Sequence, residues 1–259
     1  RWNGTQAGTD RALVFDQRRQ LGYLQLRHDG FGALADTVRA SVSYQDVVDT
    51  PMRRGGPAPR YHTYCDTQLS LGSDDSRRAS THAHGSYSWA RDDDSRAWSS
   101  GVGLNLRPSN RLSFSGSVSY EKLLDNLQYV ATADAEGAPR WVLGRIDQDT
   151  WNFTFRVNLS ITPDLTVQYY GSPFIGTGRY AEFKKATDTL AQANADRFHL
   201  FSPDEIAFRA EDNSYQVTEA GGGPSYSFAS PDFSFRQFRS NLVARWEWKP
   251  GSSLYVVWS

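Results

Sequence analysis

Apolar and polar residues alternate along most of this 259-residue chain. From Trp151 to Ile161 every second residue is large and apolar, and the residues between them are polar. From Leu112 to Tyr120 the alternation recurs, with serine at every polar position. Successive side chains of a β-strand point to opposite faces, so both segments predict strands with one apolar and one polar face.

Ten segments show this alternation, and the links between them vary in length in a regular way. The odd-numbered links are short turns, such as "RPSN", "TPD" and "KPGS", whereas most even-numbered links are longer. Short turns at one end and longer loops at the other are typical of bacterial outer-membrane barrels. The predicted strands are residues 18–28, 33–47, 60–72, 78–90, 95–106, 111–133, 140–161, 165–175, 233–248 and 252–259.

Aromatic residues near the strand ends suggest which face meets lipid. Outer-membrane barrels carry aromatic girdles at the two membrane interfaces, on the side that faces lipid. By this argument the apolar face points outward and the polar face lines the interior. The residues that suggest the girdles are Trp89, Trp98, Tyr120, Trp246, Trp248 and Trp258.

The pattern therefore predicts an all-β fold, an antiparallel up-and-down outer-membrane β-barrel with at least ten strands, incomplete in this chain. We expect one barrel domain over residues 1–259, truncated at both ends. A water-soluble antiparallel sheet shows the same alternation. A soluble, carbohydrate-binding β-sandwich, with the tryptophans in its core, thus stays an alternative.

One segment breaks the alternation. Residues Tyr180 to Phe198 are rich in alanine, lysine and glutamine, which favours a helix. The segment lies in the longest link, so we expect a short helix in a long extracellular loop.

Composition excludes several other classes of protein. The net charge of −1 argues against a nucleic-acid-binding surface. Cys65 is the single cysteine, so no internal disulfide can form. The sequence has no run of about 18 apolar residues, as an ordinary transmembrane helix requires.

Charged and amide side chains on the polar faces are the candidate functional residues. Arg156, Asn158, Arg239, Arg245 and Glu247 are expected to face the lumen. In a wet lumen such residues tune the selectivity for solutes. The competing hypothesis is structural, with an Arg–Glu network that stiffens the wall or plugs the lumen.

His82 and His84 stand two residues apart on one predicted strand face, a pattern that can bind zinc or copper. No third ligand is evident nearby, so we expect them to line the lumen as polar residues. The chain has no Gly-x-Ser-x-Gly nucleophile motif. We therefore predict no catalytic residues, no cofactor and no enzymatic activity, with a membrane-embedded hydrolase kept as an alternative.

Several segments resemble a known family. Residues Asn158 to Ala186 and Pro231 to Ser259 are similar to the bacterial domain-of-unknown-function family five-nine-one-six, as are Arg53 to Pro59 and Leu71 to Arg78. The resemblance implies an outer-membrane β-barrel, often C-terminal to a module similar to family-nine carbohydrate-binding domains. The family pattern usually continues beyond the position of Ser259 into a further loop and a closing strand. It supplies no catalytic residues.

Taken together, pattern and resemblance predict a barrel of the bacterial outer membrane that passes or binds solutes. The expected partners are membrane lipid and a small solute or glycan, with no nucleic acid. The link to glycans is an analogy with the module that accompanies the family. A structural or binding barrel with a plugged lumen stays an alternative.

Overall fold

The computed structural model describes residues 2–5, 12–30, 36–52, 61–90, 93–188, 191 and 194–259. Strands dominate the described residues, and the all-β prediction is confirmed. The strands are β1 (Trp2–Thr5), β2 (Ala12–Asp29), β3 (Thr37–Met52), β4 (Tyr61–Gly72), β5 (Ala79–Ala90), β6 (Arg96–Ser109), β7 (Leu112–Ala135), β8 (Ala138–Thr162), β9 (Leu165–Ala186), β10 (Phe198–Leu200), β11 (Ile206–Arg209), β12 (Ser214–Thr218), β13 (Ser225–Ala229), β14 (Phe233–Lys249) and β15 (Ser252–Trp258).

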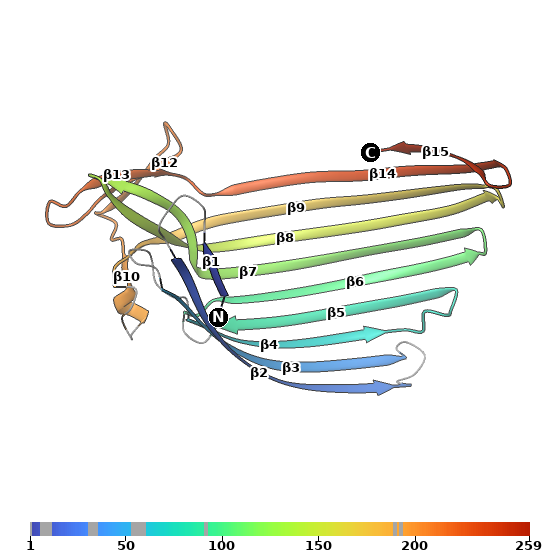
Figure 1. Ribbon diagram of the computed structural model, residues 1–259, viewed down its shortest axis with the longest axis horizontal. Helices are drawn as coiled ribbons and strands as arrows, with labels where there is room; N and C mark the ends of the chain where they lie inside the picture. The colour runs from blue at the N-terminus through green and yellow to red at the C-terminus, as the bar shows by residue number, and fades with distance from the viewer. Residues whose placement is uncertain are drawn as a thin grey trace.

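A large antiparallel sheet forms the body of the molecule (Figure 1). Its strands follow the order β1 to β9, then β14 and β15, and β10 pairs with β9. Strands β1 and β15 each pair with one neighbour, so the described sheet is open. The sequence predicts a barrel that is incomplete in this chain, and no closed barrel is seen in the described residues, because closure requires the two outermost strands to be joined.

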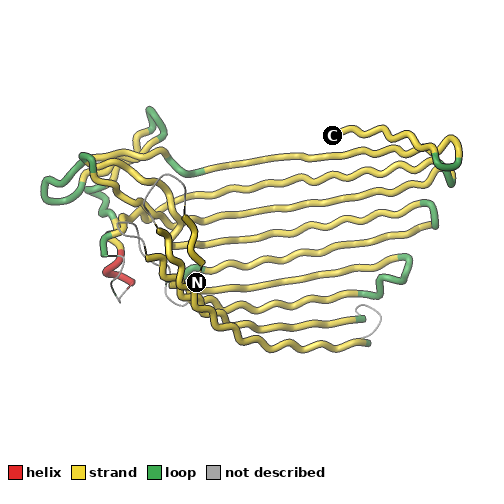
Figure 2. The backbone as a smooth tube through the Cα atoms, viewed as in Figure 1, coloured by secondary structure: helices red, strands yellow, loops and turns green. Residues whose placement is uncertain are grey.

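The ten predicted strands correspond to β2 through β9, β14 and β15. Their turns also obey the predicted sidedness. The turns after β6, β8 and β14 lie at one end, on the right in Figure 2, and the turn between β7 and β8 at Gly137 lies at the other. The loops around Pro59 and Gln192 belong to the longer links, which the same argument places at that other end, but both residues lie outside the described part of the chain.

The predicted helix over Tyr180 to Phe198 is wrong. Strand β9 continues to Ala186, because β8 is long enough to pair with it as far as Val142, opposite Lys185. This pairing overrides the local helix propensity. In the described part of the segment, helical structure is limited to the 3-10 turn η1 (Asn194–Arg197). No helix among the described residues has the length and apolar character needed to cross a membrane.

A second, three-stranded sheet of β11, β12 and β13 lies at the long-loop end. We call β10 to β13, together with the adjoining ends of β7, β8 and β9, the cap. The register between β7 and β8 shifts twice, between Asp125 and Gln128 and between Tyr129 and Ala131. Bulges of this kind bend a strand, and β7 bends toward the cap in Figure 1.

The main hydrophobic core lies in the cap. Phe183 of β9 packs against the rings of Tyr215 and Phe228, at centroid distances of 4.5 and 5.2 Å. Val142 and Val217 are fully buried beside them. The buried members of this core are Ala133, Ala135, Val142, Phe183, Phe201, Val217, Tyr226 and Phe228.

We expect Phe183→Ala to destabilise the cap by about 3–5 kcal/mol, the usual cost of removing a buried aromatic ring. Amide hydrogen exchange of residues 206–229 measures the effect. Phe208→Ala is the matched control, because the Phe208 side chain is 53% exposed. Equal losses for both variants would contradict a core centred on Phe183.

Candidate functional site

The strand register divides the large sheet into one apolar and one polar face. Phe153 of β8 lies opposite Val118 of β7, which lies opposite Val102 of β6. Directly opposed residues of antiparallel strands share a face, so these three side chains lie together. The apolar face also holds Leu69, Ala83, Leu104, Phe114, Phe155, Val157, Leu159, Val167, Leu242, Trp246 and Val256.

The apolar face is open to solvent in this chain. Val102, Trp246 and Val256 are 56%, 49% and 57% exposed. Among the described residues, no second layer covers the middle of the face, since the three-stranded sheet lies at the cap end. The described residues therefore leave the apolar side chains in the middle of this face uncovered.

An aromatic row crosses this face toward the cap end. The ring of Tyr120 on β7 lies between those of Trp98 and Trp151, at centroid distances of 4.9 and 4.7 Å. On β5, Tyr87 stacks on Trp89 at 5.6 Å. We call these five residues the aromatic row.

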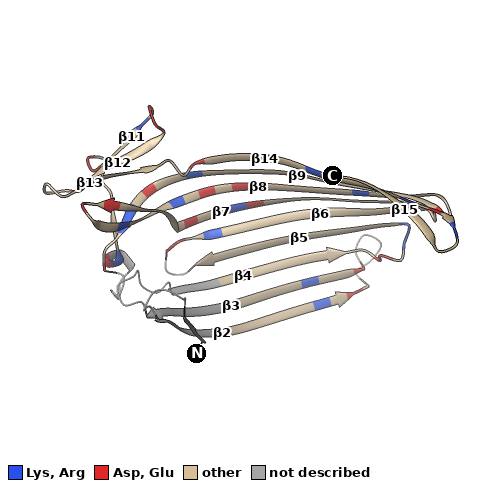
Figure 3. Cartoon of the chain, turned by 45° about the horizontal axis from the view of Figure 1, so that its top comes forward, with Lys and Arg blue, Asp and Glu red and all other residues tan. Residues whose placement is uncertain are grey.

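Charged residues begin immediately beyond the aromatic row. Lys122 lies two residues beyond Tyr120 on β7, and its Nζ is 3.1 Å from a carboxylate oxygen of Asp149 and 2.5 Å from one of Asp147. The Tyr120 hydroxyl also donates a hydrogen bond to Asp149. Figure 3 shows charged residues gathered along the cap-end part of β8. The aromatic row therefore marks a boundary between apolar and charged surface.

The apolar stretch of β8 is about as long as the apolar band of an outer-membrane barrel is tall. Strand β8 advances eight residues from Trp151 to Leu159, about 26 Å at about 3.3 Å per residue. The apolar band of outer-membrane barrels is about 25 Å tall, although strand tilt shortens the projected height.

The structure places all five predicted site residues on the polar face. Arg156 lies opposite Tyr170, and Asn158 lies opposite Gln168. Arg239 lies opposite Ser172. Arg245 and Glu247 follow it on β14 after six and eight residues, and even separations place all three side chains on the same face. That this face lines a lumen stays a prediction.

These residues make local contacts rather than one continuous network. Arg245 donates to Glu247 at 2.8 Å, a pair within one strand. The Arg156 guanidinium lies over the Tyr170 ring, 5.5 Å from its centroid, and Asn158 donates to Ser113 at 3.1 Å. The single Arg–Glu pair of this set joins neighbours along β14, so it does not bridge strands in the manner of a plug.

Hydroxyl groups and imidazoles fill much of the remaining polar face. Ser86 and Ser99 are hydrogen-bonded across β5 and β6 at 2.7 Å. The His82 and His84 rings lie over Gly103 and Gly101, where an added Cβ would approach the rings to 2.0 and 2.4 Å. The described residues contain no group of three or more histidine, cysteine, aspartate or glutamate side chains suited to a metal ion.

A family model described as "Domain of unknown function (DUF5916)" matches residues 37–259. The chain belongs to this family. The resemblance drawn from the sequence is thereby confirmed, while the outer-membrane location and the neighbouring carbohydrate-binding module stay predictions. No curated protein and no solved structure matches the chain.

The cap of this DUF5916 chain holds two carboxylates that the sequence pattern does not single out. Glu219 is buried and lies 2.9 Å from Arg140 and 2.7 Å from Lys185. Burial raises the pKa of Glu219, but hydrogen bonds from Lys185 and Arg140 outweigh this effect and leave the pKa lowered. Arg140 and Glu219 are 79 residues apart in the sequence, so no local sequence motif indicates that they pair.

Glu205 is the second carboxylate and ties three parts of the cap together. It accepts hydrogen bonds from the backbone N–H groups of Ser202 at 2.9 Å and Ala220 at 3.2 Å, and Nε2 of His199 lies 2.9 Å away. These bonds lower the pKa of Glu205 from 4.5 to about 2, with the Ser202 N–H as the largest cause. Both carboxylates therefore serve the architecture of the cap.

A lowered folded-state pKa stabilises the protein above the unfolded value and loses that contribution as the pH falls. We expect the cap to lose protection of residues 206–229 from hydrogen exchange as the pH falls from 4.5 to about 2. The lowered pKa of Glu219 should cause a further loss of this protection as the pH falls. Glu205→Gln should destabilise the cap at pH 7 by on the order of 1–3 kcal/mol and flatten this pH dependence. The exposed Glu211 provides the control variant, Glu211→Gln, and a matching change there would contradict the role of Glu205.

Proposed function

We propose that this chain forms the wall of a β-barrel in the bacterial outer membrane and that the barrel passes or binds a polar solute. The observation that supports the proposal best is the apolar face, which is exposed, about 26 Å long measured along β8, and bounded by the aromatic row and then by charge. The same sequence of apolar, aromatic and charged surface occurs where barrels cross a lipid bilayer.

The energetics favour lipid as the environment of the apolar face. Soluble monomers rarely expose a continuous apolar patch larger than a few hundred Å². Here the exposed apolar side chains run across successive strands, from Leu69 on β4 to Val256 on β15. Removing such a surface from water is favourable and roughly proportional to its area. A bilayer provides that environment without a second protein layer.

The polar face supports the second half of the proposal. Its serines, threonines, histidines and arginines are costly to bury in a dry core without partners. They are well suited to the water-filled interior of a barrel. Arg156 and Arg239 present positive charge there, and a small solute or a glycan is the partner that such a hydrogen-bonding surface suits.

The open sheet favours one competing hypothesis. If a further sheet packed on the apolar face, the domain would be a soluble β-sandwich, and the aromatic residues would form its core. The two hypotheses assign opposite environments to the same side chains, so substitutions on the apolar face distinguish them.

Phe155 tests the environment of the apolar face, because it lies midway between Trp151 and Leu159 on β8. In lipid, Phe155→Arg should cost about 2–4 kcal/mol in folding stability near the midplane, whereas Phe155→Ala should cost much less because lipid fills the space. In a sandwich core, Phe155→Ala would itself cost about 3–5 kcal/mol. Asn158→Ala, on the polar face, is the control and should be nearly neutral. Folding measurements in vesicles on all three variants decide between the two environments.

Solute passage is tested by the ion selectivity of the protein in planar bilayers. Arg239→Glu replaces a positive charge on the polar face and should lower anion permeability relative to cation permeability. Arg236→Glu is the matched control, because Arg236 lies opposite Ile175 on the apolar face. An unaltered selectivity for Arg239→Glu, or the same change for both variants, would contradict passage along the polar face. An absence of any conductance would favour the plugged, structural barrel.

A further inference from the structure

Two hollows lie on the apolar face of the large sheet, one on each side of the aromatic row. The first is a polar hollow of about 770 Å³ near the β5–β6 turn. Its lining combines aromatic rings at the apolar boundary with cationic and amide groups. These lining residues include Tyr87, Trp89, Arg96, Leu124, Asn126 and Arg145.

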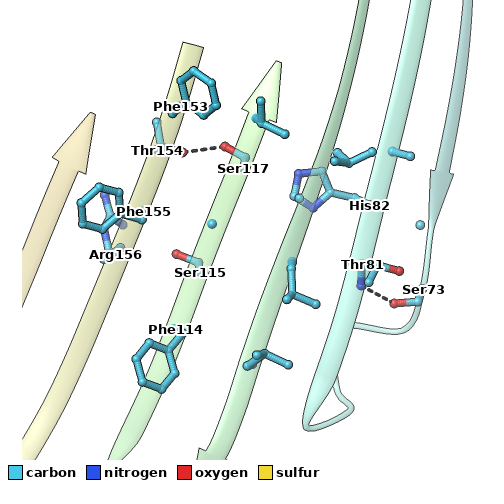
Figure 4. Close-up of a pocket in the computed structure, with 18 of the residues that line it drawn as sticks. Ser73, Thr81, His82, Phe114, Ser115, Ser117, Phe153, Thr154, Phe155 and Arg156 are labelled. Atoms are coloured by element: carbon cyan, nitrogen blue, oxygen red, sulfur yellow. Dashed lines mark hydrogen bonds between the residues drawn. The ribbon is translucent and has the colours of Figure 1, made fainter. Parts of the chain in front are cut away.

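The second hollow is apolar and has a volume of about 1260 Å³. Figure 4 shows the rings of Phe114 on β7 and of Phe153 and Phe155 on β8 around it. Its lining also includes the small residues Ala83 and Gly116. Volumes of about 300–1,000 Å³ are usual for sites that enclose small molecules, so each hollow is large enough for part of a lipid.

A lane of small residues joins the two hollows. Between Tyr87 in the polar hollow and Ala83 in the apolar hollow, the apolar-face position on β5 is Gly85. Gly85 lies opposite Ser100 of β6, which is also small. No large side chain from these two strands therefore divides the track, which covers about 13 Å from Tyr87 to Ala83 at about 3.3 Å per residue.

Arg96 and Arg145 supply the polar hollow with hydrogen-bond donors that suit an anion. Arg96 is exposed, and Arg145 lies 3.0 Å from Glu182. A guanidinium has five N–H donors, so one carboxylate partner leaves donors for a second anion. Asp94 also lines the hollow, and Asp94 and Glu182 together balance the charge of the two arginines, so the guanidinium donors and not a net positive charge would hold an anion here. Arginine is the side chain best matched to phosphate, because its planar fork can donate two parallel hydrogen bonds.

We propose that this track binds one phosphate-bearing membrane lipid, with the phosphate at Arg96 and Arg145 and an acyl chain in the apolar hollow. The proposal rests on the proposed function, because it places the track in the bilayer. The guanidinium N–H donors of Arg96 and Arg145 favour a phosphate headgroup, and continuity with the exposed apolar band favours an acyl chain. The track has a charged end and an apolar end on opposite sides of the aromatic row. A peptide ligand would not require this arrangement.

Native mass spectrometry of the protein released from detergent tests the proposal. The probes are phosphatidylglycerol, diacylglycerol with the same chains, and inorganic phosphate. The variants are Arg96→Gln combined with Arg145→Gln, and separately Gly116→Leu, which fills the apolar hollow. An added Cβ at Gly116 meets only ordinary contacts, the nearest at 3.7 Å, so this variant is compatible with the backbone.

Two control variants make the same kinds of substitution at positions that line neither hollow. Arg236→Gln removes an exposed arginine from the apolar face outside both hollows. Gly22→Leu adds the same side chain on β2, where an added Cβ has open space. Gly22 lines neither hollow.

We expect phosphatidylglycerol to be retained about tenfold better than diacylglycerol, as charge-assisted hydrogen bonds predict. The arginine pair and Gly116→Leu should each lower its retention by a similar factor, and both controls should retain it. Equal retention in all variants, equal loss in the controls, or full displacement by inorganic phosphate would overturn the proposal.

A second experiment separates failure of the lipid-site proposal from failure of the proposed function. It measures the quenching of tryptophan fluorescence by lipids with brominated acyl chains. Trp98 and Trp151 should be quenched if the apolar face meets lipid, whether or not the track binds a headgroup. Quenching without phosphate-dependent retention overturns the lipid site alone, and absence of quenching overturns the membrane assignment as well.

Discussion

The antiparallel register across the apolar band, from β2 to β9 and β14, is the constraint on which the rest of the structure depends. Side chains alternate with a period of two, so a slip of one residue moves a whole strand's apolar set to the other face. The backbone ladder thus keeps Val102, Val118 and Phe153 in line. The same ladder brings Arg156 and Tyr170 together on the other face. Every functional inference about the two faces depends on that alignment.

Where the register is interrupted, the architecture changes. The bulges between Asp125 and Ala131 on β7 lie beyond both the aromatic row and Lys122 on that strand. From there β7, β8 and β9 serve the cap, with its buried aromatic cluster and its two hydrogen-bonded carboxylates. The buried hydrophobic core therefore lies mainly in the cap and not in the middle of the large sheet. The wall between lipid and water that we propose would need this division, since its faces would be solvated by different media and would need little internal core.

The aromatic row gives the apolar face a defined edge. Tyr120 illustrates why, because its ring packs between the rings of two tryptophans while its hydroxyl donates a hydrogen bond to Asp149. An amphipathic ring is suited to such a boundary, with its apolar body on one side and its polar tip on the other. The two hollows lie on either side of this edge, so a ligand that spans both must itself be amphipathic.

The period-two pattern by itself determined the ten long strands, the two faces and the placement of Arg156, Asn158, Arg239, Arg245 and Glu247 on one of them, because alternation is a local property of an extended chain. It could not determine the strand that replaces the helix expected from Tyr180 onward, because β9 extends there only through its pairing with β8. The short strands β11 to β13 and the roles of Glu205 and Glu219 also escaped the sequence, since their partners are brought together from distant segments. The two hollows belong to the tertiary structure for the same reason: small and large residues from five neighbouring strands form them only once the register has set those strands side by side.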